Sequence, residues 1–101
     1  MLALFCTMCH ELGHARSWIK GERSAAYEAA YPVRPLSCLK DSEKRLVLDE
    51  EQRAWRYGFD LAVQVGFRDE PGYVEEAGRA LSTYYTLLDL PVPATPFTVG
   101  S

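Results

Sequence analysis

Apolar side chains recur at helical spacing along most of this chain, and that spacing predicts where its helices lie. Residues 2 to about 20 carry apolar side chains on nearly every side, which predicts a first helix that is buried all round. Good helix formers favour a short second helix over residues 22–31. Pro32 and Pro35 end that helix and predict extended backbone through residues 31–39.

The middle of the chain predicts a long helix from Asp41 or Ser42 to about residue 65, ended by Gly66. Its apolar positions recur three and four residues apart and form one stripe: Val47, Ala54, Trp55, Gly58, Ala62 and Val65. The same spacing places Glu51 inside that stripe. Because a buried charge is costly unless it is paired or bound to a metal, Glu51 is singled out as a candidate functional residue.

A third long helix is predicted to begin near Asp69, where acidic residues and Pro71 suit a helix N-terminus, and to end near residue 88. The proline-rich segment that follows is expected to pack loosely or not at all. The pattern therefore predicts a mainly α fold: one small domain of three main helices over residues 1–90, and a tail over residues 91–101. The expected core residues are Trp18, Trp55, Phe59 and Leu81.

Composition limits the classes of protein that fit. The 101 residues suit one small domain, and 48% of them are apolar. The net charge of −3 argues against a nucleic-acid surface. The sequence contains no run of about 18 apolar residues, so no membrane span is predicted. The first eight residues are too short for a signal peptide, so a cytoplasmic protein is expected. Three cysteines argue against a disulfide framework and predict reduced, buried thiols.

The chain has two histidines, and both fall in one short motif, His10-Glu11-Leu12-Gly13-His14. On a helix, residues four apart lie on one face, roughly 6 Å apart, so both imidazoles can reach one tetrahedral Zn²⁺. Glu11 is offset by about 100° around the helix axis. It is thereby aimed at the open coordination position, where a carboxylate can take a proton from water. The motif predicts zinc ligands at His10 and His14 and a general base at Glu11; the alternative is two surface histidines on an ordinary helix.

With Ala15 included, the motif resembles the active-site helix of the zincin metallopeptidases, most closely the gluzincin branch with the ImmA/IrrE-type peptidases and the minigluzincins. The resemblance implies a zinc-dependent metallopeptidase that acts on a peptide or protein substrate. Zn²⁺ would polarise both water and the scissile carbonyl, and Glu11 would take the water proton and pass it to the leaving amine. Membrane-embedded site-2 proteases share the motif, but the lack of an apolar span removes them.

The resemblance also implies a third zinc ligand. The stretch that begins at Glu51 resembles the Glu-x-x-Ala stretch of ImmA/IrrE-type enzymes, in which the Glu binds zinc, so Glu51 is the expected ligand. Glu50, about 100° round the helix, is the close rival, and Asp49 is less favoured. The remaining alternative is that these three acidic residues form a solvated helix surface.

The chain departs from the family in two respects. Trp55 stands where gluzincins place an Asp or Asn that supports a zinc-bound His, so Asp41, Asp60 or a backbone carbonyl is expected in that role. Zincins also place a substrate-holding sheet before the motif helix, and the early position of the motif predicts that this sheet is missing. A catalytically silent zinc-binding or interaction protein is therefore the first alternative function.

Two further assignments stay open. Cys6, Cys9 and His10 also match a covalent haem attachment pattern, so a c-type haem protein is a second alternative, and the two cysteines are another candidate zinc pair. An oxyanion-stabilising group is usual in such peptidases. Four tyrosines are candidates for that role: Tyr57, Tyr73, Tyr84 and Tyr85. The oligomeric state is not predicted.

Overall fold

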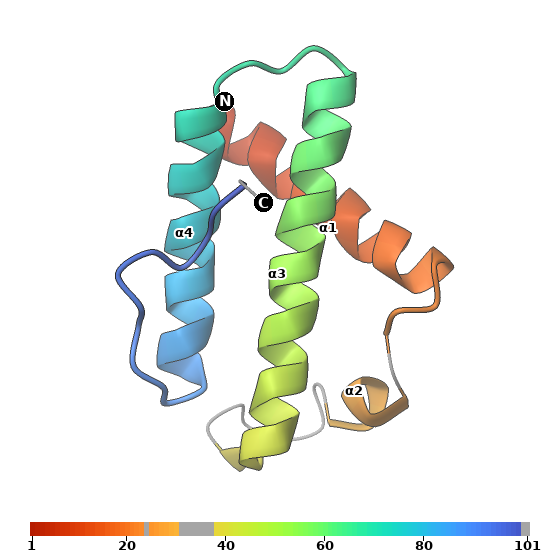
Figure 1. The fold of residues 1–101 in the computed structure, drawn as a ribbon, viewed down its shortest axis with the longest axis vertical. Coiled ribbons are helices and arrows are strands. Elements are labelled where there is room, and N and C mark those ends of the chain that lie inside the picture. Colours follow the sequence, from red (N-terminus) through yellow and green to blue (C-terminus); the bar gives the residue numbers. More distant parts are fainter. Residues whose placement is uncertain (24, 31–37, 100–101) are drawn as a thin grey trace.

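The computed structural model describes residues 1–23, 25–30 and 38–99, and every regular element in these ranges is a helix (Figure 1). Three long helices enclose the core: α1 (Leu2–Ile19), α3 (Asp41–Gln64) and α4 (Glu70–Leu87). A short helix, α2 (Ala25–Ala30), follows α1. The mainly α fold is thereby confirmed for the described part of the chain. The extended backbone predicted around Pro32 and Pro35, and Tyr31 of the predicted second helix, lie outside the described residues.

Local sequence explains where the long helices begin. Asp69 precedes α4, and its side chain accepts a hydrogen bond from the Gly72 backbone N–H at 3.0 Å. This bond satisfies one of the free donors of the first turn. At α3 the cap is Lys40, just before the expected caps, and its backbone N–H donates to Glu43 Oε1 at 2.8 Å. The carboxylate of Glu43, at the third helical position, therefore satisfies a backbone donor at the start of α3.

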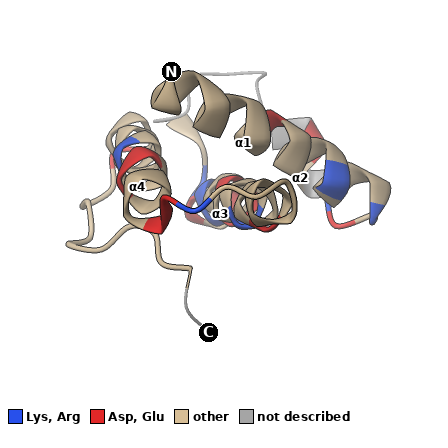
Figure 2. Cartoon of the chain, turned by 90° about the horizontal axis from the view of Figure 1, so that it is seen from above, with Lys and Arg blue, Asp and Glu red and all other residues tan. Residues whose placement is uncertain are grey.

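α1 lies across α3, and α4 runs beside α3 and touches both helices (Figure 1, Figure 2). The crossing is close enough for backbones to meet. A Cβ on Gly58 would lie 2.6 Å from the carbonyl oxygen of Cys9, a separation that real Cβ atoms essentially never show. Because Cys9 precedes the first histidine of the motif, this glycine lets α1 bring the motif against the Glu51-bearing helix, as the sequence predicted.

α1 buries one face only, so the prediction of a helix surrounded by protein is wrong. Its buried residues recur at helical spacing: Cys6, Cys9, Gly13 and Ser17. Apolar side chains that are more than half exposed lie on other sides: Leu4, Met8, Leu12, Trp18 and Ile19. Trp18 is therefore not a core residue. The reason is that α3 and α4 approach α1 from the same side (Figure 2). Although α1 exposes these apolar side chains, no described helix is long and apolar enough to cross a membrane.

Aromatic rings form the centre of the core between α1, α3 and α4. Tyr73 of α4 is fully buried, and its ring contacts those of Trp55, Phe59 and Phe67. Its hydroxyl donates a hydrogen bond to the Trp55 carbonyl oxygen at 2.6 Å, which satisfies the polar end of the ring inside the core. Trp55 and Leu81 are buried as predicted, and Phe59 packs against them half-buried.

The C-terminal segment, expected to pack loosely or not at all, is exposed over residues 91–95 but contacts this core near its end, through Phe97. Phe97 is 4% exposed, and its ring centroid lies 6.1 Å from that of Tyr73. The chain reverses after α4 at Asp89, which has a φ of 59°, and then runs back over the helices (Figure 1). The proline content suggested weak packing, but a single buried aromatic side chain is enough to attach a short segment to the core.

Candidate metal centre

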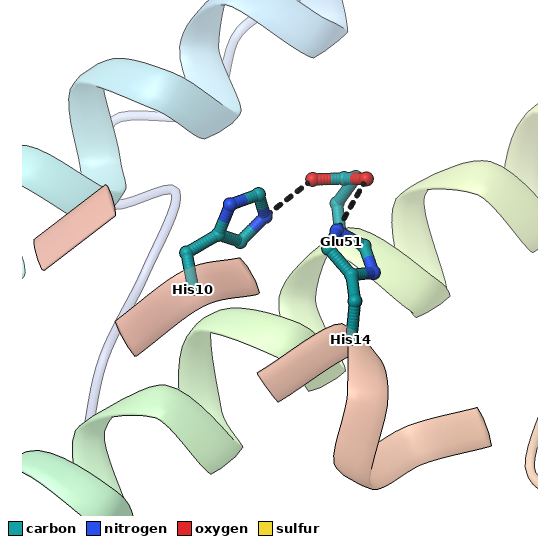
Figure 3. Close-up of side chains that lie close together, drawn as sticks. All are labelled: His10, His14 and Glu51. Carbon is teal, nitrogen blue, oxygen red and sulfur yellow. Dashed lines mark hydrogen bonds and ion pairs between the residues drawn. The ribbon is translucent and has the colours of Figure 1, made fainter. Parts of the chain in front are cut away.

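His10 and His14 lie one turn apart on α1, and both rings meet a single carboxylate from α3 (Figure 3). Nε2 of His10 is 2.9 Å from Glu51 Oε1, and Nε2 of His14 is 3.1 Å from Glu51 Oε2. The two histidine side chains are 13% and 18% exposed, and the Glu51 side chain is 2% exposed. The motif of α1 and the predicted third ligand of α3 are thus brought together.

His10, His14 and Glu51 form a group that could hold a metal ion. One donor atom from each residue lies within 4.8 Å of the other two. Two imidazole nitrogens and one carboxylate oxygen are also the donor set of catalytic zinc sites, in which three protein ligands leave a fourth position open. The donor chemistry therefore fits a metal.

Electrostatic interactions within the group favour the charged forms of both Glu51 and His14. Burial alone raises the pKa of Glu51, but the hydrogen bonds and charges of His10 and His14 outweigh it and lower the pKa to about 2. Burial alone lowers the pKa of His14, whereas its hydrogen bonds to Glu51 and Glu50 and their charges raise that pKa overall. Without a metal, the buried carboxylate of Glu51 is therefore compensated by imidazolium charge, and a metal cation can take over that role.

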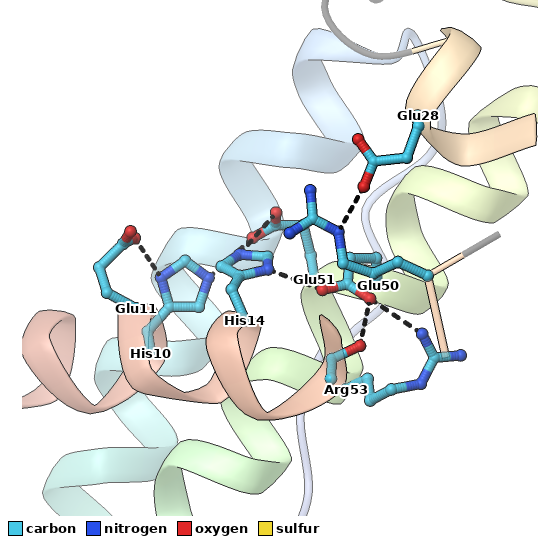
Figure 4. A network of polar contacts seen from close by, with 9 residues as sticks. His10, Glu11, His14, Glu28, Glu50, Glu51 and Arg53 are labelled. Carbon is cyan, nitrogen blue, oxygen red and sulfur yellow. Dashed lines mark hydrogen bonds and ion pairs between the residues drawn. The ribbon is translucent and has the colours of Figure 1, made fainter. Parts of the chain in front are cut away.

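Glu50, the rival ligand, is buried as deeply as Glu51 but faces a different histidine nitrogen (Figure 4). Its Oε2 is 2.8 Å from Nδ1 of His14. Its Oε1 accepts hydrogen bonds from Ser17 Oγ at 2.7 Å and from Arg53 Nη1 at 3.0 Å. The alternative of a solvated acidic surface is excluded for Glu50 and Glu51, because both side chains lie inside the α1–α3 contact.

The side chains that support the histidines differ from those expected. Asp41 and Asp60, suggested as supporting carboxylates, are exposed. Trp55 packs its ring on His10 instead, with centroids 4.5 Å apart and planes inclined by 19°. Glu50 contacts the other histidine. Sequence reasoning named Glu50 only as a rival ligand, although its position beside Glu51 was the signal that could have suggested a supporting role.

Glu11 lies beside the donor group rather than within it. Its carboxylate oxygen is 3.3 Å from Nδ1 of His10, the ring nitrogen that does not face Glu51 (Figure 4). The side chain is 70% exposed and lines a cavity next to the donors. An exposed side chain can adopt other rotamers at little cost, so Glu11 lies where it can turn towards the cavity.

The cavity beside the donors has a volume of about 280 Å³. It is lined by His10, Glu11, His14, Arg23, Tyr27, Glu51 and Tyr84. Of the four tyrosines considered from the sequence, Tyr84 alone lines it. Tyr73 is buried in the core, where burial raises its pKa, and Tyr57 donates a hydrogen bond to Glu22. Tyr85 lines a different and larger cavity of about 400 Å³, which contains none of the donor residues.

Cys6, Cys9 and Cys38 are free thiols, so the expectation of no disulfide is confirmed. Cys6 and Cys9 are buried in the core as expected, whereas Cys38 is exposed. Burial raises the pKa of Cys6 to about 11 and also raises that of Cys9, which disfavours the thiolate form that binds metals. Attachment of haem to both thiols would disrupt the core in which they pack, so this arrangement argues against the haem alternative.

No family model, no curated protein and no solved structure matches this chain. The likeness of the His10–His14 motif to the zincins therefore stays a resemblance carried by a few residues.

Proposed function

We propose that this chain binds zinc through His10, His14 and Glu51 and is a metallopeptidase-like hydrolase that acts on peptide bonds. One observation carries the proposal: two helices bring two imidazole nitrogens and one carboxylate oxygen within 4.8 Å of one another. Three protein ligands with an open fourth position are typical of catalytic zinc sites, whereas structural sites usually have four protein ligands. The residue after His10 is a glutamate, as the chemistry of such a site requires.

The metal donors, Glu11 and Tyr84 have distinct roles in this proposal, and all of them line the cavity. A zinc ion held there would supply Lewis acidity, lowering the pKa of water and polarising a peptide carbonyl. Glu11 is the general base, which takes a proton from the attacking water and returns it to the leaving amine. Tyr84, which lines the same cavity, is the candidate donor to the oxyanion. The cavity would hold a short stretch of a peptide or protein substrate.

A catalytically silent zinc-binding protein is the second candidate, and one contact favours it. Glu11 lies against Nδ1 of His10 and away from the nitrogen that faces Glu51. A protein that keeps this contact with metal bound would lack a positioned base, and it would bind zinc without hydrolysing peptides.

The test incubates the zinc-loaded chain with a mixed peptide library and reads products by mass spectrometry. A hydrolase cleaves peptides, loses activity on chelation and regains it with Zn²⁺. Glu11→Gln should retain the metal and lose cleavage, because its carboxylate is assigned as base and not as ligand. Glu75→Gln, on the exposed surface of α4, is the matched control and should change neither property.

The outcomes separate the alternatives. Zinc binding without cleavage supports the silent protein, and failure to bind zinc refutes both candidates. Loss of the metal in Glu11→Gln would make Glu11 a ligand and overturn its assignment as base.

A further inference from the structure

The two adjacent glutamates of α3 have different partners, although both are buried. Glu51 faces the Nε2 atoms of both histidines. Glu50 is 1% exposed and lies outside the donor group that could hold a metal. Its carboxylate instead contacts Nδ1 of His14, so the two nitrogens of one imidazole ring face two different carboxylates.

We infer that Glu50, anchored by Ser17 and Arg53, is a positioning residue that keeps the proton of His14 on Nδ1 and turns Nε2 towards the metal position. The inference rests on the proposed zinc site for its consequence, but the hydrogen bond itself is a property of the metal-free chain. A histidine that binds a metal through Nε2 commonly donates its other N–H to a carboxylate, which sets the tautomer and the ring orientation.

The hydrogen-bond directions carry this inference. Oε1 of Glu50 accepts from the Ser17 hydroxyl at 2.7 Å and from the Arg53 guanidinium at 3.0 Å. A carboxylate has no proton to donate, so the bond between Oε2 and His14 at 2.8 Å must run from Nδ1–H to the carboxylate. When a metal displaces the proton on Nε2, the proton that stays on Nδ1 leaves a neutral ring whose lone pair is at Nε2, the atom that faces Glu51.

The contacts of Glu50 could also serve a purely structural role, because a buried carboxylate needs compensating donors. Ser17 is fully buried and lies one turn after His14 on α1, so the donors come from both helices. The contrast with His10 favours the positioning role. Nδ1 of His10 lies 3.3 Å from the exposed carboxylate of Glu11, and the His10 ring stacks on Trp55.

Glu50→Gln is the discriminating substitution because it keeps the size of the side chain. An amide has one oxygen, which cannot serve both the Ser17–Arg53 donors and Nδ1–H of His14. If the oxygen stays with Ser17 and Arg53, the amide NH₂ faces Nδ1 and forces the ring proton onto Nε2, the metal-binding atom. Asp49→Asn removes the same charge one residue earlier, from a half-buried side chain, and is the matched control.

Zinc affinity is measured by competition with a chromophoric chelator, and coordination by the visible spectrum of the Co²⁺-loaded chain. Glu50→Gln should lower zinc affinity about tenfold to hundredfold, the usual effect of losing an outer-shell partner. The Co²⁺ spectrum should keep its band positions, because the ligands are unchanged. Asp49→Asn should change neither. Equal affinity in the two variants would reduce Glu50 to a structural residue, and an altered Co²⁺ spectrum would make it a ligand.

A second measurement keeps the inference separate from the proposed function. In ¹⁵N-resolved NMR of the metal-free wild-type chain, Nδ1–H of His14 should give a downfield proton that is protected from exchange, and Glu50→Gln should lose it. Absence of that signal in the wild type overturns the inference, whether or not zinc binds. If Glu50→Gln does not fold, Ser17→Ala decides: a severalfold loss of zinc affinity supports the inference, and an unchanged affinity overturns it.

Discussion

Gly13 of α1 and Ala54 of α3 bring the backbones of the two site-bearing helices into direct contact. A Cβ on Gly13 would lie 1.9 Å from the carbonyl oxygen of Ala54, so no other residue fits here without moving a helix. Gly13 lies between His10 and His14 in the chain, and Ala54 lies one turn after Glu51. This contact therefore sets how closely the nitrogen and oxygen donors can approach one another.

Gly13→Ala should destabilise the fold by about 3 kcal/mol, the upper part of the usual range for an overpacked core, since the added methyl meets backbone. It should also weaken zinc binding, because separating α1 from α3 moves both histidines away from Glu51. Gly78→Ala is the control. A Cβ there meets nothing within 4 Å, so the better helix propensity should raise stability by about 1 kcal/mol. Urea unfolding measures both changes, and similar effects at the two glycines would contradict a tight crossing.

The metal-free protein should bind one Zn²⁺ per chain, and zinc at a hundred times its dissociation constant should add about 2.7 kcal/mol of stability. Glu51→Ala should abolish most of this gain, because it removes the donor that α3 supplies to the group. Glu51→Ala should lower zinc affinity by more than roughly a hundredfold, the largest effect usual for a residue that only hydrogen-bonds to a metal ligand. Calorimetric titration and thermal unfolding with and without zinc give these values. An unchanged zinc-dependent shift in Glu51→Ala would remove Glu51 from the site.

The contribution of Glu51 and His14 to the stability of the metal-free protein should be greatest in mildly acidic solution. The folded-state pKa of Glu51 is lowered, so its contribution is present above the unfolded value of 4.5 and is lost as pH falls towards about 2. The folded-state pKa of His14 is raised, so its contribution is complete below the unfolded value of 6.5 and is lost as pH rises through the folded-state pKa. The pair therefore contributes most between pH 4.5 and 6.5.

Zinc should reverse this trend above pH 6.5, because the metal competes with the proton on Nε2 of His14. The increase in melting temperature caused by zinc should thus grow in the range where the stability of the metal-free protein declines. Thermal unfolding from pH 3 to 9, with zinc and with chelator, measures both curves. His14→Ala should flatten the alkaline side of the metal-free curve. A zinc effect that does not depend on pH would contradict histidine ligation.

Tyr84→Phe should lower the turnover of any peptide cleavage by about a hundredfold, the usual effect of removing one oxyanion donor. Its zinc affinity should stay unchanged, because the phenol is outside the donor group. Tyr85→Phe removes a hydroxyl from a neighbouring residue that lines a different cavity, and it should have little effect. Steady-state kinetics on the best peptide of the library gives the comparison, and equal turnover of both variants would remove Tyr84 from the mechanism.

Short-range patterns alone determined the helices and the histidine pair. His10 and His14 are four residues apart, so any helix through the motif puts them on one face, whatever packs against it. Asp69 was readable as a helix start for the same reason, since a cap acts within one turn. Glu51 stood out because it is a charge within an apolar stripe.

Only the tertiary structure separated Glu51 from Glu50 and showed which side of α1 is buried. Neighbouring residues on α3 differ by about 100°, and both can lie inside a contact with a crossing helix. The position of α1 decides that one glutamate meets the Nε2 atoms and the other Nδ1 of His14. Trp18 was expected in the core but is exposed, and the tail was not expected to bury Phe97, for a related reason. Helical spacing shows which residues share a face, but the burial of that face depends on residues distant in the chain, which local periodicity does not encode.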